Sequence, residues 1–212
     1  MRTDDLIVEL AGGLKPAGGV GRPMALAVAI AIVGGLVILM LGPWGVRPDI
    51  AQAVRSEPFW MKASYTLAFA AAGALLVERL GRPGGRGGAG WVVLGLAVAA
   101  IATLAAFELA RLPIASWPAD VMGDSAKICA VSVMLISAPA FVAAQWLMRR
   151  LAPTRPRLAG AAAGLLASGL GATVYGLFCQ ETAAAFTAIW YTSAMLVWPA
   201  VGALIGPRLL RW

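Results

Sequence analysis

Histidine is absent from this chain, and cysteines and charged residues are scarce. The 212 residues contain no His, two Cys and only 13% Asp, Glu, Lys and Arg, about half the charged fraction typical of soluble domains. Without His, the chain lacks the commonest acid-base group at neutral pH and a frequent zinc ligand, which argues against an ordinary hydrolase or zinc site. Because so little charged surface could face water, we do not expect a water-soluble globule.

Long apolar runs take the place of the missing charge. Hydrophobic residues make up 60% of the chain, and about 20 apolar residues in a row suffice to cross a bilayer core. Pro, Gly and charged residues bound six such runs, which predict an all-α integral membrane protein with six transmembrane helices in three hairpins. The predicted helices lie at 24–42, 58–80, 91–110, 126–147, 157–178 and 186–206. A segment at 1–23 precedes this bundle (24–206), and a tail at 207–212 follows it.

Basic residues gather on one side of the predicted membrane. Positively charged loops are retained in the cytoplasm, so this side is predicted to be cytoplasmic and to carry both termini. The net charge of +7 is therefore interpreted as a topology signal reinforced by anionic lipid, with no direct nucleic-acid partner. Twelve of the seventeen Lys and Arg define the cytoplasmic side: Arg2, Lys15, Arg22, Arg79, Arg82, Arg86, Arg149, Arg150, Arg155, Arg157, Arg208 and Arg211.

Two cysteines are predicted to lie at one depth near the opposite, outer side. Cys129 lies about one turn into the fourth predicted helix, and Cys179 lies at the end of the fifth. In an oxidising compartment the two thiols could form a disulfide; the alternative is that each is a small buried apolar side chain. They do not form a Cys-x-x-Cys motif, so a thiol oxidoreductase lacks its usual signature.

Charged residues flank both cysteines. Asp124 is placed to cap the fourth helix, which would satisfy free amides at its positive end. As an alternative, Asp124 or Glu181 could join two thiolates in an outward-facing site for a soft metal ion, with Lys127 promoting thiolate formation. Lys62 and Lys127 lie near helix ends, and we expect both to extend to water.

Two further features concern helix packing. Glu108 is expected to pair with Arg111, since residues three apart are neighbours on a helix. Small residues recur at every fourth position of the fifth predicted helix and permit close approach of another helix, either within the bundle or across a homodimer seam. They are Gly160, Gly164, Ser168 and Ala172.

The first residues predict a short amphipathic helix on the cytoplasmic side. A helix of about nine residues is marginal alone in water, so it needs a surface on which to form. That surface is either the membrane, for which an acidic polar face is poorly suited, or an apolar groove in a protein partner. The residues of this segment are Thr3 as N-cap, Asp4 and Asp5 in the first turn, and Leu6, Ile7 and Leu10 on the apolar stripe.

Several short stretches, taken in order, resemble one bacterial family, the negative regulator of sigma F (NrsF) family of inner-membrane anti-sigma factors. The resemblance covers nearly the whole chain and rests on the order and spacing of these stretches. They are Thr3-Asp4-Asp5-Leu6-Ile7, Arg47-Pro48-Asp49, Pro58-Phe59-Trp60-Met61-Lys62, Gly123-Asp124-Ser125, the two Cys, Ile189-Trp190-Tyr191-Thr192 and Gly206-Pro207-Arg208.

The resemblance implies a regulator rather than an enzyme. Such a protein holds an extracytoplasmic-function sigma factor inactive at the bacterial inner membrane and releases it under stress such as chromate or cadmium. Sensing is assigned to a cysteine pair, whose matching positions here are Cys129 and Cys179, with no cofactor other than a heavy metal bound transiently. The family segment at the second Cys has a neighbouring His that is missing here, which leaves thiol oxidation or metal capture by sulfur alone.

A second interpretation belongs to a different class: a membrane thiol oxidoreductase or a small-solute transporter. The absence of a Cys-x-x-Cys motif and of charged residues at the predicted midplane argues against both.

Overall fold

The structure, a computed structural model, describes residues 3, 12, 21–41, 47–151 and 153–210. Within these ranges every regular element is a helix. The long helices are α2 (Gly21–Leu41), α4 (Glu57–Leu80), α5 (Gly88–Arg111), α7 (Ala126–Arg149), α8 (Pro156–Tyr175) and α10 (Thr192–Leu209). Short segments connect them: α3 (Ile50–Ala53), the 3-10 turn η1 (Ile114–Ser116), α6 (Trp117–Met122), α9 (Ala184–Phe186) and the π-helical turn η2 (Thr187–Tyr191).

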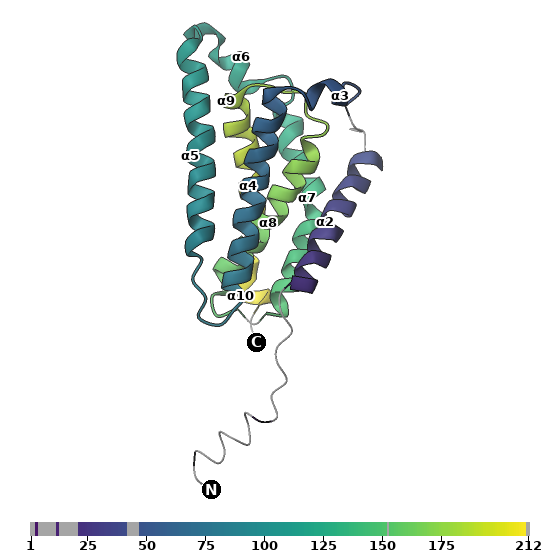
Figure 1. Ribbon diagram of the computed structural model, residues 1–212, viewed down its shortest axis with the longest axis vertical. Helices are drawn as coiled ribbons and strands as arrows, with labels where there is room; N and C mark the ends of the chain where they lie inside the picture. Colours follow the sequence, from purple (N-terminus) through teal and green to yellow (C-terminus); the bar gives the residue numbers. More distant parts are fainter. Residues whose placement is uncertain (1–2, 4–11, 13–20, 42–46, 152, 211–212) are drawn as a thin grey trace.

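The long helices run alternately up and down (Figure 1). Five of them agree with the predicted ranges to within three residues, whereas α10 begins six residues after the predicted start at 186. The predicted sixth range begins in α9, because α9 and η2 lead directly into α10. In the described part of the chain, five helices are long and apolar enough to cross a membrane, with Ala184–Leu209 counted as one, and α2 contributes a shorter apolar stretch at Met24–Ile38. The helical fold is therefore as predicted, while the six-span topology with both termini in the cytoplasm stays a prediction.

One boundary changes the position of a candidate residue. The helix α8 ends at Tyr175, three residues before the predicted end at 178, and Gly176 follows it. The chain then continues in tight turns, in which the Cys179 amide donates to the Tyr175 carbonyl at 3.1 Å. Cys179 therefore lies in the loop between α8 and α9, which corrects its expected place at the end of the helix.

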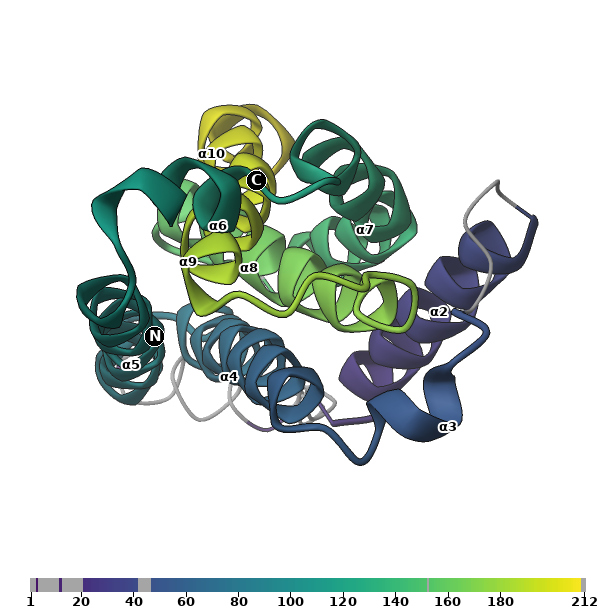
Figure 2. The same ribbon diagram turned by 90° about the horizontal axis from the view of Figure 1, so that it is seen from above.

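The helix α8 lies at the centre of the bundle. Seen from above in Figure 2, α4, α7 and α10 surround it, and its closest packing partners are these three helices. The helix α2 packs mainly on α7, and α5 lies at the periphery against α4. The apolar core thus forms around one helix of small residues.

Small residues bring α8 and α10 into close contact. A Cβ added to Gly160 would collide with the carbonyl of Gly202, and the reverse also holds. Ser168 and Ala172, further along the same face, are fully buried. The prediction of close helix approach is confirmed, and these residues serve packing within a single chain.

The two ends of the bundle differ in composition. We call the end formed by residues 47–56, 112–129 and 175–187 the cysteine end, because it carries both cysteines. The opposite end, formed by residues 79–88, 149–157 and 207–210, is called the basic end. The arginines of the basic end are Arg79, Arg82, Arg86, Arg149, Arg150, Arg155, Arg157 and Arg208.

Candidate functional site at the cysteine end

Both cysteines are free thiols buried in one apolar cluster. Cys129, in the first turns of α7, is fully buried, and Cys179, in the α8–α9 loop, is 2% exposed. Two tyrosines belong to the same cluster: the Tyr175 hydroxyl lies beside the Cys129 thiol, and the Tyr191 hydroxyl lies beside the Cys179 thiol. The structure thus brings together two thiols that are 50 residues apart in the sequence.

The two tyrosines come from different elements, and the sequence assigned neither of them to the site. Tyr175 is the last residue of α8, whereas Tyr191 is the last residue of the π-helical turn η2. Their ring centroids are 5.9 Å apart. Such π-helical turns are rare and frequent at functional sites, and here the turn delivers Tyr191 to the thiol of the preceding loop.

A partly open cavity of about 440 Å³ reaches this cluster from the cysteine end. Polar and charged residues make up most of its lining, which also includes Cys179 and Tyr175. Its lining residues are Asp124, Ser125, Tyr175, Phe178, Cys179, Gln180 and Glu181. Of the two cysteines, Cys179 is therefore the one that lines this cavity.

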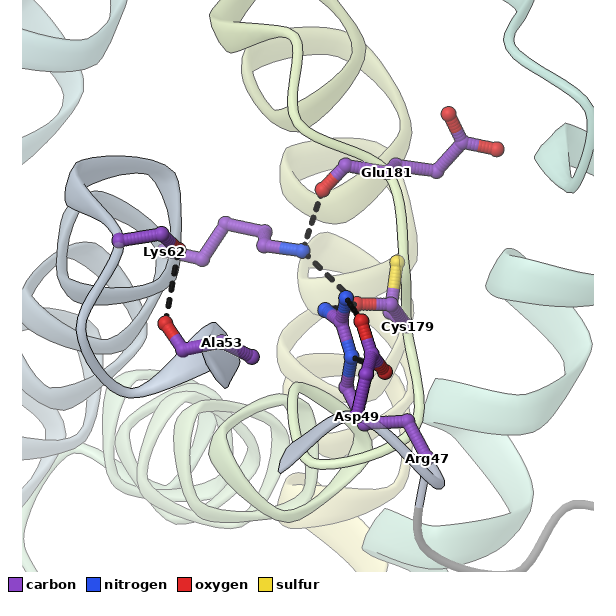
Figure 3. Close-up of polar contacts among 7 residues, drawn as sticks. Arg47, Asp49, Ala53, Lys62, Cys179 and Glu181 are labelled. Carbon is purple, nitrogen blue, oxygen red and sulfur yellow. Dashed lines mark hydrogen bonds and ion pairs between the residues drawn. The ribbon is translucent and has the colours of Figure 1, made fainter. Parts of the chain in front are cut away.

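Lys62 holds the loop that carries Cys179. Its ammonium, on the second turn of α4, points at this loop in Figure 3 and donates to the Cys179 carbonyl at 3.0 Å and to the Glu181 carbonyl at 2.5 Å. Only 3% of Lys62 is exposed. The expectation that Lys62 extends to water is therefore wrong, because the loop supplies carbonyl acceptors inside the bundle.

Arg47 reaches the same carbonyl from another direction. Its guanidinium donates to the Cys179 carbonyl at 3.3 Å, and its backbone N–H donates to the Leu177 carbonyl at 3.2 Å. Two further hydrogen bonds, at 2.6 and 2.7 Å, join the guanidinium to Asp49. These bonds raise the pKa of Arg47 and lower the pKa of Asp49. Two cations from separate segments thus converge on one backbone oxygen.

Glu181 anchors the other end of the loop to the start of α7. One carboxylate oxygen accepts from the N–H groups of Asp124 and Ser125 at 2.9 and 3.0 Å and from the Ser125 hydroxyl at 2.8 Å. Gly123 makes room for this carboxylate, because a Cβ there would lie 2.6 Å from the second oxygen. The expectation that Asp124 caps the helix is wrong: its side chain makes no cap, and Glu181 occupies the turn before α7.

Glu108 likewise bonds to backbone instead of its expected partner. Its carboxylate accepts from the Ala185 N–H at 2.9 Å, which ties α5 to α9. Arg111 stacks over the Phe107 ring with its guanidinium carbon 3.9 Å from the ring centroid. The expected Glu108–Arg111 pair does not form, because the start of α9 offers free amide groups.

The placement of the remaining predicted residues limits what this site can bind. Among the described residues, no three His, Cys, Asp or Glu gather as ligands for a metal ion. Glu181 is engaged as an anchor and Asp124 is exposed. Lys127 lies in the first turn of α7, and its side chain is outside the described part. Sulfur is thus the donor that this cluster offers to a soft ion.

The predicted docking segment lies almost wholly outside the described residues. Of its members only Thr3 is described, and it is exposed. Asp4, Asp5, Leu6, Ile7 and Leu10 fall outside the described ranges.

The sequence contained a signal for one of the residues that were missed. Lys62 stands inside an apolar run, and ionisable residues in such runs are functional candidates by default. Arg47 and Tyr191 belong to stretches that resemble the family, but no signal in the sequence linked them or Tyr175 to the cysteines, because their roles depend on contacts made by the fold.

The described part of the chain is thus an apolar helical bundle with two buried thiols at one end and a cluster of arginines at the other. The family model described as "Negative regulator of sigma F" matches residues 10–212, and the chain belongs to this family. It is similar along the full length of both chains to the anti-sigma-F factor NrsF of Caulobacter vibrioides, with 39% identity, and to the probable anti-sigma-F factor NrsF of Azospira oryzae, with 41% identity. These names are those of regulators rather than enzymes. No solved structure matches the chain.

Proposed function

We propose that this chain is a membrane-bound anti-sigma factor that senses stress through Cys129 and Cys179. Its N-terminal segment sequesters an extracytoplasmic-function sigma factor, and a heavy metal or an oxidant acting on the cysteine pair releases it. The chain sits in the bacterial inner membrane with both termini in the cytoplasm, so the basic end meets the sigma factor and anionic lipid while the cysteine end faces the periplasm.

One observation carries this proposal: the backbone carbonyl of Cys179 accepts from both Arg47 and Lys62. Arg47 follows α2, and the other end of α2 begins next to the predicted docking segment. Lys62 belongs to α4, which packs on the central helix α8. Any change at Cys179 therefore acts on two helices that extend to the basic end.

The chemistry at the pair has two forms. On metal capture, the two thiols lose two protons and two metal–sulfur bonds form. On oxidation, the thiols lose two protons and pass two electrons to an oxidant of the periplasm as a disulfide forms. Both forms draw the sulfur atoms together and shift the loop that Arg47 and Lys62 hold.

A modest energetic coupling is sufficient. Tenfold weaker sigma-factor binding needs a difference of about 1.4 kcal/mol between the two states of the bundle. That is comparable to one or two hydrogen bonds, such as those from Arg47 and Lys62.

A pull-down of the cognate sigma factor by the detergent-solubilised chain tests the binding half of the proposal. Removal of residues 1–14, or the substitutions Leu6→Asp and Leu10→Asp, should abolish binding. Ile114→Asp is a matched control, because Ile114 is 78% exposed at the opposite end and should leave binding unchanged. Retained binding by the Leu variants would refute the docking segment.

The sensing half needs a separate measurement. Cys129→Ser and Cys179→Ser should still bind the sigma factor but should fail to release it on addition of Cd²⁺ or a thiol oxidant. If both variants release it as wild type does, the cysteine pair is not the sensor. Substrate-dependent thiol turnover in the absence of any sigma factor would instead favour a membrane oxidoreductase.

A further inference from the structure

The hydroxyl groups of Tyr175 and Tyr191 are unusual for buried groups in the described part of the chain. Both side chains are fully buried, and neither hydroxyl has a hydrogen-bond partner within the described residues. A buried hydroxyl without a partner costs free energy, and native structures contain few such groups. The buried Tyr65 follows the usual rule, because its hydroxyl shares a hydrogen bond of 2.6 Å with Thr192.

The position of each hydroxyl explains this exception. Tyr175 lies near Ser132 and Cys129, and Tyr191 lies near Cys179, so each hydroxyl without a partner has a sulfur atom among its neighbours. A neutral thiol is a weak acceptor, whereas a thiolate accepts strong charge-assisted hydrogen bonds. A phenol that lacks a good partner beside a thiol therefore gains one when the sulfur loses its proton.

We propose that Tyr175 and Tyr191 are positioning residues of the cysteine pair, which donate hydrogen bonds to the sulfur atoms of Cys129 and Cys179 once these bind a soft divalent cation as thiolates. This inference rests on the proposed function and names the groups that make metal capture favourable in a buried site. The two S–H bonds break, two metal–sulfur bonds form, and two protons leave through the cavity that Cys179 and Tyr175 line.

Charge balance supports this arrangement. One divalent cation and two thiolates are neutral together, so their burial avoids the cost of an isolated charge. The two phenols then take the role that outer-shell donors have around metal ligands, which fix the orientation of the ligand.

The test uses Cd²⁺ as the probe and the full chain in detergent. The absorption of the sulfur-to-cadmium charge transfer reports binding, and thermal unfolding of the metal-free protein reports stability. Tyr175→Phe and Tyr191→Phe should each weaken Cd²⁺ binding by about tenfold, as loss of an outer-shell partner does. The same variants should keep or raise the metal-free unfolding temperature, because each loses a hydroxyl that had no partner.

Tyr65→Phe is the matched control. It removes a buried hydroxyl that has a partner, so it should lower the unfolding temperature and leave Cd²⁺ affinity unchanged. The inference is overturned if the Tyr175 and Tyr191 variants bind Cd²⁺ as tightly as wild type, or if they lose stability as Tyr65→Phe does.

Serine variants of the cysteines separate this inference from the function on which it rests. Cys129→Ser and Cys179→Ser should each lose the absorption band. If they keep it, or if the wild type shows none, metal capture by the pair fails. If the band requires both cysteines but ignores both tyrosines, only the role of the phenols is refuted.

Discussion

The cysteine end and the basic end of this bundle use charged residues in opposite ways. At the cysteine end, Lys62, Arg47 and Glu181 all bond to backbone groups of neighbouring segments. At the basic end, the Arg82–Glu78 pair is exposed on both sides, with 61% and 47% of the side chains accessible. Charges at the first end hold loops in place, whereas charges at the second end are available to a partner.

Elementary energetics explains why this difference matters. An exposed ion pair contributes about 0–1 kcal/mol, since water and salt screen it. A buried charged donor that is removed leaves its acceptors unsatisfied, which costs about 1–3 kcal/mol. Matched substitutions at the two ends should therefore have unequal effects. Equal effects within a matched pair of variants would contradict this difference between the two ends.

The largest difference is expected between two glycines with positive φ. Gly123→Ala strains a residue at φ 51° and pushes a Cβ against the Glu181 carboxylate, so we expect it to lower the free energy of unfolding in detergent by about 3 kcal/mol. Gly84→Ala strains a similar backbone at φ 72° with open space around the new Cβ and should cost only about 1 kcal/mol. Equal losses would show that Glu181 does not anchor the turn before α7.

The second contrast compares two cations. Lys62→Met removes the donor to two loop carbonyls, so the loop should open about ten- to a hundredfold more often. The rate at which a thiol reagent labels Cys179 in a Cys129→Ser background measures this opening. Arg82→Met, which removes an exposed cation at the basic end, should leave the labelling rate unchanged. A rate that is insensitive to Lys62→Met would contradict the assignment of Lys62 as the loop anchor.

The third contrast compares two carboxylates. Glu181→Ala loses three hydrogen bonds to the turn before α7 and should lower the free energy of unfolding by about 1–2 kcal/mol. Glu78→Ala loses only the exposed pair with Arg82 and should change it by no more than about 0.5 kcal/mol. Denaturant unfolding of both variants in one detergent gives the comparison, and a larger loss for Glu78→Ala would reverse it.

Much of the fold could be predicted from the sequence, because apolar length and small-residue spacing are local properties. The six helical ranges and the close packing at Gly160 both follow from such patterns. The degree to which each helix is buried could not be predicted from its apolar length. In α8, 83% of the most apolar stretch is buried inside the bundle, against 11% in α5, although both are apolar runs. Small side chains admit neighbouring helices, so α8 occupies the centre and the bulkier α5 lies outside.

The site was harder to predict because its contacts join distant segments. Both cysteines were recognised, but the loop between α8 and α9 determines which groups surround them. Lys62 and Glu181 therefore have other roles in the structure than the sequence predicted. Each bonds to a backbone group of a distant segment, whose position a local sequence pattern does not give. From sequence alone, a lysine near a helix end is predicted to extend to water, whereas the fold can supply buried carbonyl acceptors to it.

The smallest effect concerns the ion pair between Arg47 and Asp49, in which 44% of the Asp49 side chain is exposed. The hydrogen bond from Arg47 lowers the pKa of Asp49, so its contribution to stability is fully present above the unfolded value of about 4 and is lost as the pH falls through the lower folded value. We therefore expect the thermal midpoint of wild type to fall slightly more than that of Asp49→Asn between pH 5 and about pH 2. High salt should reduce the difference because it screens an exposed pair. Identical pH profiles at low salt would mean that the bond between Asp49 and Arg47 does not contribute to stability.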